Sequence, residues 1–261
     1  MNIIDFHVHI YPEKIAEKAT QNVGLFYGVT MAHTAGTVPA LLERGAKAGV
    51  THYVAHGVAT APNQVVGVND YLAAVKAQYD NIFMFGTLHP DMENSEGEIN
   101  RIEAAGFKGV KLHPDCQNFA LDDKKALTML EPLQGRLPLL IHAGDVRYRN
   151  SNPKQIVRML DALPGLTLIA AHLGGYSAWD DALEHLSGRD VYVDTSSTLP
   201  MLSPERAKRQ IEAFSPDKIL FGTDFPMWQA EDELAMLRQL VPDDAFLEKI
   251  LWSNGKKLLG I

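Results

Sequence analysis

The sequence contains, close to its amino terminus, the stretch Ile3-Ile4-Asp5-Phe6-His7-Val8-His9-Ile10-Tyr11-Pro12. Its apolar residues predict a buried strand that ends at Pro12. Alternate side chains of a strand share a face, so His7 and His9 point the same way, about 6–7 Å apart along the strand. Two such imidazoles can bind a metal ion such as zinc, or they can be hydrogen-bonded structural histidines. The positions of the other histidines are needed to decide between these interpretations.

Length and composition limit the class of protein. The chain has 261 residues, of which 46% are hydrophobic and 21% charged, which is typical of a globular protein with a large core. Single (β/α) barrel domains have about 250 residues, so one domain is expected. The 32 Asp and Glu residues exceed the 24 Lys and Arg residues, giving a formal net charge of −8. This acidic balance argues against nucleic-acid or anionic-membrane partners.

Cysteine usage and the amino-terminal residues predict the compartment. Cys116 is the single cysteine, so no intrachain disulfide can form, and a reducing compartment is expected. Asp5 and His7 stand where a signal peptide would need an apolar run. No apolar run reaches the roughly 18 residues that span a bilayer. We therefore expect a soluble, cytoplasmic protein.

Short apolar segments that alternate with helical patterns predict the fold. Besides the first strand, strands are predicted over residues 51–56, 82–88, 109–112, 139–141, 166–171, 191–194 and 218–222. Helices are predicted over residues 12–21, 38–48, 68–79, 96–105, 121–133, 153–163, 179–186, 204–214, 231–240 and 243–252. A Gly-rich loop is expected through Gly24, Gly28 and Gly36, and a turn at residues 256–259.

Such alternation predicts a parallel sheet, because each helix supplies the crossover between two strands. The Rossmann fingerprint is missing after the first strand, which disfavours an open doubly wound sheet. Eight units in a chain of this length therefore predict an α/β protein with the (β/α)8 TIM-barrel fold, as a single domain over residues 1–261.

Polar residues stand at the ends of the predicted strands, where (β/α)8 barrels carry their active sites. In strand order these residues are His9, His56, His89, His113, His142, His172, Asp194 and Asp224. Histidine is only moderately frequent in ordinary cores, so a ring of histidines needs an explanation. A metal site is the simplest one.

Five motifs carry a resemblance to a known superfamily. They are Asp5-Phe6-His7-Val8-His9, Gly109-Val110-Lys111-Leu112-His113-Pro114, Ile141-His142-Ala143-Gly144, Ala171-His172-Leu173-Gly174-Gly175 and Gly222-Thr223-Asp224-Phe225-Pro226. The sequence resembles the amidohydrolase superfamily over residues 5–260. Within it, the sequence is most similar to the amidohydrolase-related branch that includes aminocarboxymuconate-semialdehyde decarboxylase and the resorcylate decarboxylases. These motifs are specific for superfamily and fold, but not for substrate.

The resemblance implies one divalent metal ion bound by His7, His9, His142 and Asp224. Zn²⁺ is the first candidate, with Mn²⁺, Fe²⁺ or Co²⁺ as alternatives. Asp224 would also accept a proton from a metal-activated water. In this branch His172 is not a ligand and would act as an acid or base. The alternative for these five residues is a buried polar network without metal.

Three further residues are predicted to line the substrate site. Lys111 and His113 alternate on the fourth strand, so they would face the same side. An unmodified Lys111 that orients or charge-balances the pocket is favoured. The resemblance to two-metal members of the superfamily implies an alternative, in which a modified Lys111 bridges two metals and His172 becomes a ligand. Arg147, favoured over Arg149 in the loop after the fifth strand, could hold a substrate carboxylate with its guanidinium fork.

Two histidines at strand ends keep open roles. The resemblance assigns neither His56 nor His89 as a ligand, and each is either a pocket-lining or a packing residue. Cys116 follows His113 closely but has no catalytic partner that the sequence identifies, so it is not interpreted as a nucleophile.

The expected function is hydrolysis, in which a metal-activated water attacks a carbonyl of a small carboxylate-bearing amide or lactone. The alternative uses the same residues for non-oxidative decarboxylation of a small unsaturated or aromatic acid. A non-enzymatic metal-binding barrel ranks below both. The expected partner is thus a small carboxylic acid, and homodimers are common in this branch, although no stretch of sequence identifies an interface.

Overall fold

The computed structural model describes residues 2–261. Eight strands follow one another in the sheet in chain order, from β1 to β8, and the neighbouring strands pair in parallel. Helices separate the successive strands along the chain. This strand order is that of a (β/α)8 TIM barrel. The predicted fold class is confirmed, and the single domain over residues 1–261 stays a prediction.

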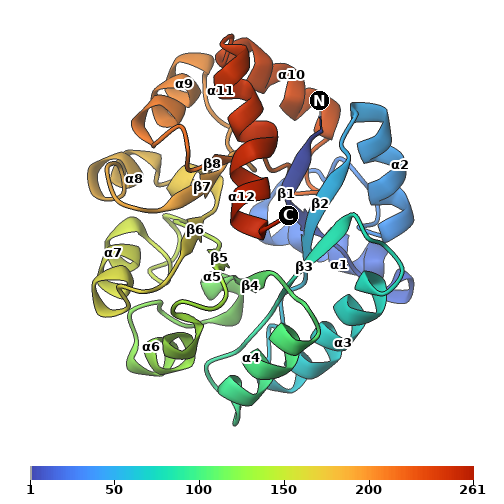
Figure 1. The fold of residues 1–261 in the computed structure, drawn as a ribbon, viewed down its shortest axis with the longest axis vertical. Coiled ribbons are helices and arrows are strands. Elements are labelled where there is room, and N and C mark those ends of the chain that lie inside the picture. The colour runs from blue at the N-terminus through green and yellow to red at the C-terminus, as the bar shows by residue number, and fades with distance from the viewer. Residues whose placement is uncertain (1) are drawn as a thin grey trace. The chain divides into compact units, whose positions relative to one another are not determined.

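The chain groups into two compact units, Met1–His56 with Thr195–Ile261, and Gly57–Asp194. The elements of the first unit are β1 (Ile4–His9), α1 (Glu13–Tyr27), α2 (Val38–Ala48), β2 (His52–His56), α9 (Pro204–Ala213), β8 (Ile219–Leu220), α10 (Ala230–Leu240), α11 (Asp244–Glu248), a π-helical turn η4 (Lys249–Ser253) and α12 (Asn254–Leu259). In Figure 1 this unit is the blue part together with the orange and red part.

Alternate side chains of β1 face opposite sides of the strand, with apolar residues on one side and the histidines on the other. Ile4, Phe6 and Val8 are buried apolar residues, and α12 packs against the strand. β1 pairs in parallel with β2, with His9 opposite His56. The backbone N–H of Phe6 also donates to Phe221 O, which follows β8, at 2.8 Å. The histidines of β1 therefore stand on a strand that is fixed on both edges.

The second unit holds the middle of the chain. Its elements are η1 (Pro62–Gln64), α3 (Val65–Lys76), β3 (Ile82–Gly86), α4 (Ser95–Ala104), β4 (Gly109–Leu112), α5 (Pro114–Gln117), α6 (Lys124–Leu130), η2 (Glu131–Leu133), β5 (Leu139–Ile141), α7 (Pro153–Ala162), β6 (Leu168–Ala170), η3 (His172–Gly174), α8 (Trp179–His185) and β7 (Tyr192–Asp194). Its helices α3, α4, α6, α7 and α8 lie on the outer side of its strands (Figure 1). The strands themselves are short and buried, which matches their apolar sequences.

Helix starts follow local sequence signals. The side chains of Thr37, Asn152 and Ser203 each accept a hydrogen bond from the backbone N–H three residues further on. Asn152 and Gln155 form a complete capping box at the start of α7. Each of these helices also has proline in its first turn, where the missing N–H costs nothing. The predicted starts of these three helices agree with the structure.

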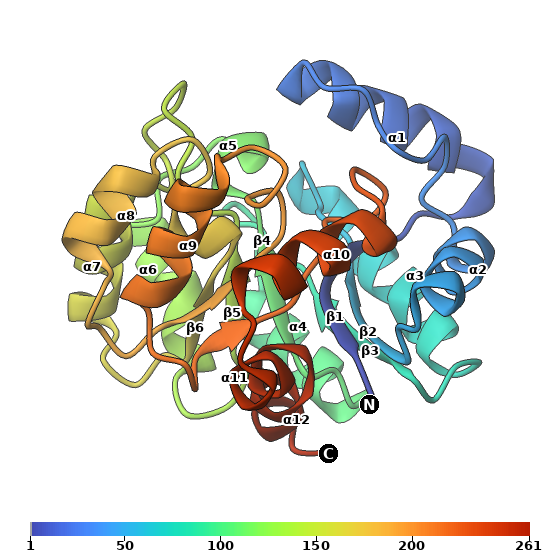
Figure 2. The ribbon, with the colours of Figure 1, turned by 90° about the horizontal axis from the view of Figure 1, so that it is seen from above.

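The sequence prediction places the end of the first helix too early. α1 does not end in a loop before Gly24 but continues to Tyr27, with Gly28 at φ 69° as its cap. The returning chain packs directly on Gly24, because a Cβ there would lie 3.0 Å from both Met31 Cγ and Val29 O. Figure 2 shows α1 beyond the carboxyl end of β1. The predicted turn at 256–259 is also wrong, since α12 covers it.

The length and apolar character of the helices show whether any of them could cross a membrane. α1, with 15 residues, is longer than any other helix in the described chain. None of the helices within residues 2–261 has the length and apolar character needed to cross a bilayer.

A buried amide joins three segments of the second unit. Asn69 Nδ2 donates to Thr87 O at 3.0 Å and to Glu98 Oε1 at 2.6 Å, while Thr87 N donates to Asn69 Oδ1 at 2.8 Å. Asn69 and Thr87 are fully buried. The amide therefore ties α3 to the end of β3 and to α4.

We predict that Asn69→Ala lowers the free energy of unfolding by about 3 kcal/mol, because it leaves buried backbone groups of Thr87 without partners. Urea denaturation measures the change. The control is Asn63→Ala, at an exposed position of η1, which should change stability by no more than about 0.5 kcal/mol. Equal losses in the two variants would contradict this role for Asn69.

Candidate active site

β1 and the loop after β8 bring three predicted ligands together. Asp224 follows β8 with a left-handed backbone, φ 59°, and its N–H donates to His7 O at 2.8 Å. His9 N donates in turn to Phe225 O at 2.7 Å. As a result Asp224 Oδ1 lies 3.5 Å from His7 Nε2 and 3.3 Å from His9 Nε2. Two imidazoles and one carboxylate thus converge.

These separations fit a shared metal ion. In a tetrahedral zinc site with bonds of about 2.0–2.1 Å, neighbouring ligand atoms lie about 3.3–3.4 Å apart. The contacts of Asp224 Oδ1 with His7 Nε2 and His9 Nε2 agree with this spacing. The side chains of His9 and Asp224 are 15% and 11% exposed, whereas His7 is only 1% exposed. Solvent therefore reaches the group from the side of His9 and Asp224.

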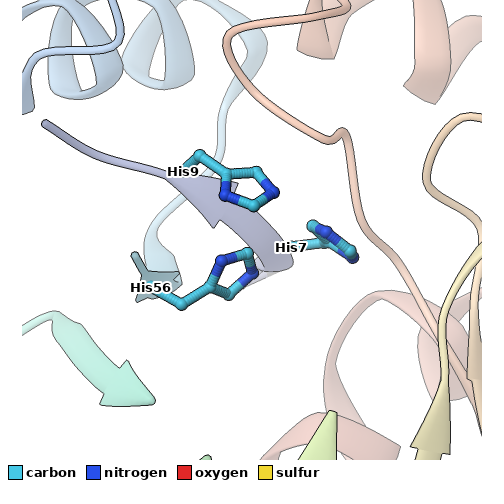
Figure 3. Close-up of side chains that lie close together, drawn as sticks. All are labelled: His7, His9 and His56. Atoms are coloured by element: carbon cyan, nitrogen blue, oxygen red, sulfur yellow. The ribbon is translucent and has the colours of Figure 1, made fainter. Parts of the chain in front are cut away.

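A third imidazole joins the two histidines of β1. His56, the last residue of β2, is fully buried, and its ring centroid lies 4.8 Å from that of His7 and 4.3 Å from that of His9. Figure 3 shows the three rings close together beside β1. One ligand atom from each residue lies within 4.8 Å of the others. His56 is therefore a further candidate ligand.

The carboxylate of Asp5 holds the Asp224 loop against β1. Thr223 Oγ1 donates to Asp5 Oδ2 at 2.6 Å, and Thr223 N donates to Asp5 Oδ1 at 3.0 Å. Phe225 N then donates to Thr223 Oγ1 at 3.1 Å. These buried hydrogen bonds fix the backbone on both sides of Asp224.

Two serines orient the candidate ligands. Ser197 Oγ donates to Asp224 Oδ2 at 2.6 Å, which leaves Oδ1 directed at the histidines. Ser196 Oγ contacts His7 Nδ1 at 3.1 Å, so Nε2 is the nitrogen that faces Asp224. Such outer contacts fix the ring orientation and basicity of metal ligands.

The second unit contains its own histidine cluster. His142 Nδ1 lies 2.9 Å from His172 Nε2, and the ring of His113 stacks on that of His142 with centroids 4.1 Å apart and planes 7° apart. All three side chains are buried. Lys111, two residues before His113 on β4, is buried as well. The predicted substrate-lining, ligand and acid–base residues of this unit therefore lie at neighbouring strand ends.

His172 is held in a strained conformation. His172 and the following Leu173 have φ angles of 61° and 47°, which cost free energy for residues other than glycine. His172 N donates to Asp194 Oδ1 at 3.1 Å, and Trp179 Nε1 donates to His172 O at 3.0 Å. These contacts keep the backbone in place and aim Nε2 at His142. Backbone strain of this kind is common at functional sites.

Arg147 is bound to a residue of its own loop. Its Nε donates to Asp145 Oδ1 at 3.0 Å and its Nη2 to Asp145 Oδ2 at 2.7 Å. Hydrogen bonding to this buried carboxylate raises the pKa of Arg147 above its ordinary value. The Arg147 side chain is 42% exposed. Arg147 is the predicted anchor for a substrate carboxylate, and one edge of its guanidinium group therefore already binds Asp145.

Two other residues discussed in the sequence analysis are His89 and Cys116. His89 Nδ1 accepts a hydrogen bond from Asp91 N at 3.2 Å at the end of β3, and burial lowers the pKa of His89. Burial also raises the pKa of the Cys116 thiol to about 12. A thiol with such a pKa is a poor nucleophile at neutral pH, in agreement with the sequence interpretation.

Comparison with known proteins identifies the family. The family model described as Amidohydrolase matches residues 4–261. The chain belongs to the amidohydrolase family. The predicted superfamily is thereby confirmed, and with it the prediction of an enzyme. Among curated proteins no match is found.

Solved structures similar to this amidohydrolase share its fold. The 5-carboxyvanillate decarboxylase from Sphingomonas paucimobilis is 14% identical, with 100% of this chain and 99% of that chain covered and a TM-score of 0.76. A probable 2-pyrone-4,6-dicarboxylic acid hydrolase from Acinetobacter baumannii, with citric acid bound, is 19% identical, with 100% of both chains covered and a TM-score of 0.74. A dihydroxybenzoic acid decarboxylase from Polaromonas sp. JS666, with bound manganese and an inhibitor, is 15% identical, covering 100% and 97%, with a TM-score of 0.74.

The predicted site residues of the amidohydrolase fall into two groups. His7, His9 and Asp224 meet in the first unit, while His113, His142 and His172 meet in the second. The sequence interpretation left His56 open between packing and pocket. The sequence holds one signal for the position of His56. His56 ends the second strand, and the parallel β1–β2 pair places it beside His9 at the end of the first strand. The contacts of Asp5, Ser196 and Ser197 with Thr223, His7 and Asp224 were not predicted, since they depend on the fold.

We predict that Thr223→Val in this amidohydrolase weakens Co²⁺ binding about 10- to 100-fold, as is typical when a residue that orients metal ligands is lost. The substitution removes the hydroxyl between Asp5 and Phe225 but keeps the shape of the side chain. Titration of metal-free protein with Co²⁺, followed by visible absorption, measures the affinity. Thr20→Val is the matched control, because Thr20 is equally buried and its hydroxyl accepts a hydrogen bond from Gly36 N. Unchanged Co²⁺ affinity in folded Thr223→Val would contradict the role of Asp5 and Thr223.

Proposed function

We propose that this amidohydrolase is a metal-dependent hydrolase of a small, carboxylate-bearing amide or lactone. The observation that carries the proposal is the convergence of His7 Nε2 and His9 Nε2 on Asp224 Oδ1, at 3.5 and 3.3 Å. A purely structural network would not require these three side chains to match the ligand spacing of a metal ion. The family match supports the same class of enzyme.

The donor set fits a divalent ion. Imidazole and carboxylate ligands suit Zn²⁺ first, and Mn²⁺, Fe²⁺ or Co²⁺ as alternatives. When bound, such an ion lowers the pKa of water and polarises a carbonyl group. His7, His9 and Asp224 would hold it, with His56 as a further candidate. His142, the fourth ligand that the sequence predicts, belongs to the other unit, and its participation remains a proposal, as does a second ion with a modified Lys111.

The residues of the chain would move the protons. The Asp224 carboxylate would accept a proton from the attacking water as the water oxygen bonds to the carbonyl carbon. Ser197, which donates to Oδ2, keeps that carboxylate oriented during the transfer. His172 is the proposed acid that protonates the leaving nitrogen or oxygen when its bond to the carbonyl carbon breaks. Positioned acids and bases of this kind contribute roughly 10²- to 10⁴-fold to rate.

The substrate is proposed to be a small carboxylic acid. Similar structures are named for acids, namely 5-carboxyvanillate, 2-pyrone-4,6-dicarboxylic acid and dihydroxybenzoic acid. Arg147 remains the proposed anchor for the substrate carboxylate, with Lys111 and His113 lining the site. Because Asp145 binds one edge of Arg147, the carboxylate would approach another part of the guanidinium group.

Decarboxylation is the second candidate, favoured by the presence of decarboxylases among the similar structures. In that reaction the bond between the substrate carbon and its carboxylate breaks, carbon dioxide leaves, and the electron pair stays on the substrate carbon. A proton from His172 or Asp224 then replaces the lost group. The same side chains would thus serve both reactions.

Assembly and location stay proposals from the sequence. A homodimer is proposed because dimers are common in the branch that the sequence resembles. A cytoplasmic location is proposed because the sequence has a single cysteine.

An assay of both reactions tests the proposed function. The metal-loaded protein is incubated with lactones, amides and aromatic acids, and hydrolysis and carbon dioxide release are scored in parallel. We predict hydrolysis, and a loss of at least about 100-fold in kcat/KM for both Asp224→Asn and His172→Asn. Asp161→Asn, which removes an exposed carboxylate paired with Arg189, is the control that should keep full activity.

The outcomes separate the candidates. Carbon dioxide release without hydrolysis would replace the proposal by the decarboxylase. If metal is bound but neither reaction is observed, the result would favour the non-enzymatic barrel.

A further inference from the structure

We propose that Trp228 is a positioning residue that fixes the Ser197 hydroxyl and, through it, the carboxylate of Asp224. The indole N–H of Trp228 binds the serine oxygen, and the serine hydroxyl binds Asp224 Oδ2. The effect of this pair on catalysis rests on the proposed function, in which Asp224 accepts a proton from the attacking water.

The chain of hydrogen bonds starts at a group that can only donate. The indole nitrogen of tryptophan is a donor and not an acceptor, so Trp228 Nε1 donates to Ser197 Oγ at 2.8 Å. Ser197 Oγ in turn donates to Asp224 Oδ2 at 2.6 Å. A hydroxyl that accepts one hydrogen bond becomes a stronger donor in another, because successive hydrogen bonds polarise one another. The indole therefore strengthens the bond between the serine and the carboxylate.

A second acceptor lies beside the serine hydroxyl. Met227 Sδ is 3.3 Å from Ser197 Oγ, and a thioether sulfur accepts hydrogen bonds only weakly. The indole N–H of Trp228 holds the serine oxygen where the carboxylate of Asp224 is the nearer acceptor. Without that N–H, the serine oxygen would lose one of its two anchors and would be free to turn toward Met227.

Both residues at the two ends of the serine–carboxylate bond have strained backbones. Ser197 has a φ angle of 48° and Asp224 one of 59°, both in the left-handed region. Such conformations cost free energy for residues other than glycine and persist where the surrounding contacts over-determine them. Ser197 is fully buried, so its hydroxyl depends on contacts within the protein. The bond from Trp228 is one of these contacts.

The loop that carries Trp228 is itself held in place. Met227 N donates to Asp224 O at 2.8 Å, which closes a turn between the carboxylate residue and the tryptophan. His33 N, in the segment that follows α1, donates to Pro226 O at 3.2 Å. Trp228 therefore has a defined place relative to Asp224, as a positioning residue requires.

The direction of the Asp224 carboxylate follows from these contacts. While Ser197 binds Oδ2, Oδ1 lies 3.5 Å from His7 Nε2 and 3.3 Å from His9 Nε2. Outer contacts of this kind orient metal ligands, and the loss of one typically lowers metal affinity by about 10- to 100-fold. Trp228 would thus set the geometry of the candidate ligands through Ser197.

Nuclear magnetic resonance of the indole groups tests the contact in metal-free protein. The chain has three tryptophans, so ¹⁵N-labelled protein gives three indole N–H signals, and the Trp228 signal is the one lost in Trp228→Phe. We expect Ser197→Ala to move the Trp228 signal toward that of an unbonded indole. The signal of Trp252, which lies beside His52 at the start of β2, should not move. An unchanged Trp228 signal in folded Ser197→Ala would overturn the proposal.

A second variant removes the same hydroxyl and relieves the backbone strain. Glycine adopts a φ angle of 48° readily, so Ser197→Gly is expected to fold even if Ser197→Ala does not. The Trp228 indole signal should shift in Ser197→Gly as well, and the absence of a shift would equally overturn the proposal.

A double-mutant cycle tests whether Trp228 acts through Ser197. Trp228→Phe keeps an aromatic ring but lacks the N–H, and we expect it to weaken Co²⁺ binding about tenfold, as measured by visible absorption. In protein that carries Ser197→Ala or Ser197→Gly, the same substitution should cause no further loss, because the two residues act in series. Trp252→Phe is the matched control and should leave the Co²⁺ affinity unchanged.

Two results of the cycle would contradict the positioning role. One is an unchanged Co²⁺ affinity in folded Trp228→Phe. The other is an equal loss of affinity with and without the Ser197 hydroxyl, which would show that Trp228 only packs against the loop. If Co²⁺ does not bind the unsubstituted protein, the positioning role falls together with the metal site, while the indole signals still decide whether the contact exists.

Activity provides a separate readout once a substrate is identified. At saturating metal we expect Trp228→Phe to lower kcat about tenfold with little change in KM, because a displaced Asp224 carboxylate accepts the proton less well. Unchanged kcat would overturn the catalytic part. If the unsubstituted protein has no activity, the proposed function fails, whereas the metal-binding cycle still stands or falls by itself.

Discussion

Two backbone hydrogen bonds join β1 to the loop after β8, and the candidate metal site depends on them. Asp224 N binds His7 O and His9 N binds Phe225 O, at 2.8 and 2.7 Å. Asp5 and Thr223, 218 residues apart in sequence, add the side-chain contacts that lock the same loop. Only with these contacts does a carboxylate from the last strand face two imidazoles from the first. The spacing of the donor atoms, and hence the chemistry proposed for them, follows from this closure.

In the second unit, packing and backbone strain fix the positions of His142 and His172. His142 is stacked under His113, and His172 is held at a left-handed φ by contacts with Asp194 and Trp179. Strain at His172 is tolerated because buried hydrogen bonds over-determine its backbone. Both groups of histidines therefore have rings whose direction is set before any ligand binds, which is the arrangement that catalysis by positioned acids and bases requires.

Much of this could be predicted from the sequence where the signal is local. The eight apolar segments predicted the fold. The alternation along the first strand predicted that His7 and His9 share a face, whereas the further site residues His142, His172 and Asp224 came from the resemblance to the amidohydrolase superfamily. Roles that depend on distant partners could not be predicted. Asp145, which occupies one edge of Arg147, and Asp115, which faces His142, are ordinary acidic residues until the fold places them. The helix prediction ended before Gly24, because the sequence alone does not show that a turn later in the chain packs on this glycine.

Anomalous diffraction tests the central claim most directly, namely that His7, His9 and Asp224 bind one metal ion. Crystals are grown with one equivalent of Zn²⁺, and data are collected on both sides of the zinc absorption edge. We predict one anomalous peak at about 2.0–2.2 Å from His7 Nε2, His9 Nε2 and an oxygen of Asp224. A fully occupied zinc peak elsewhere in the protein, with these three side chains free of metal, would contradict it.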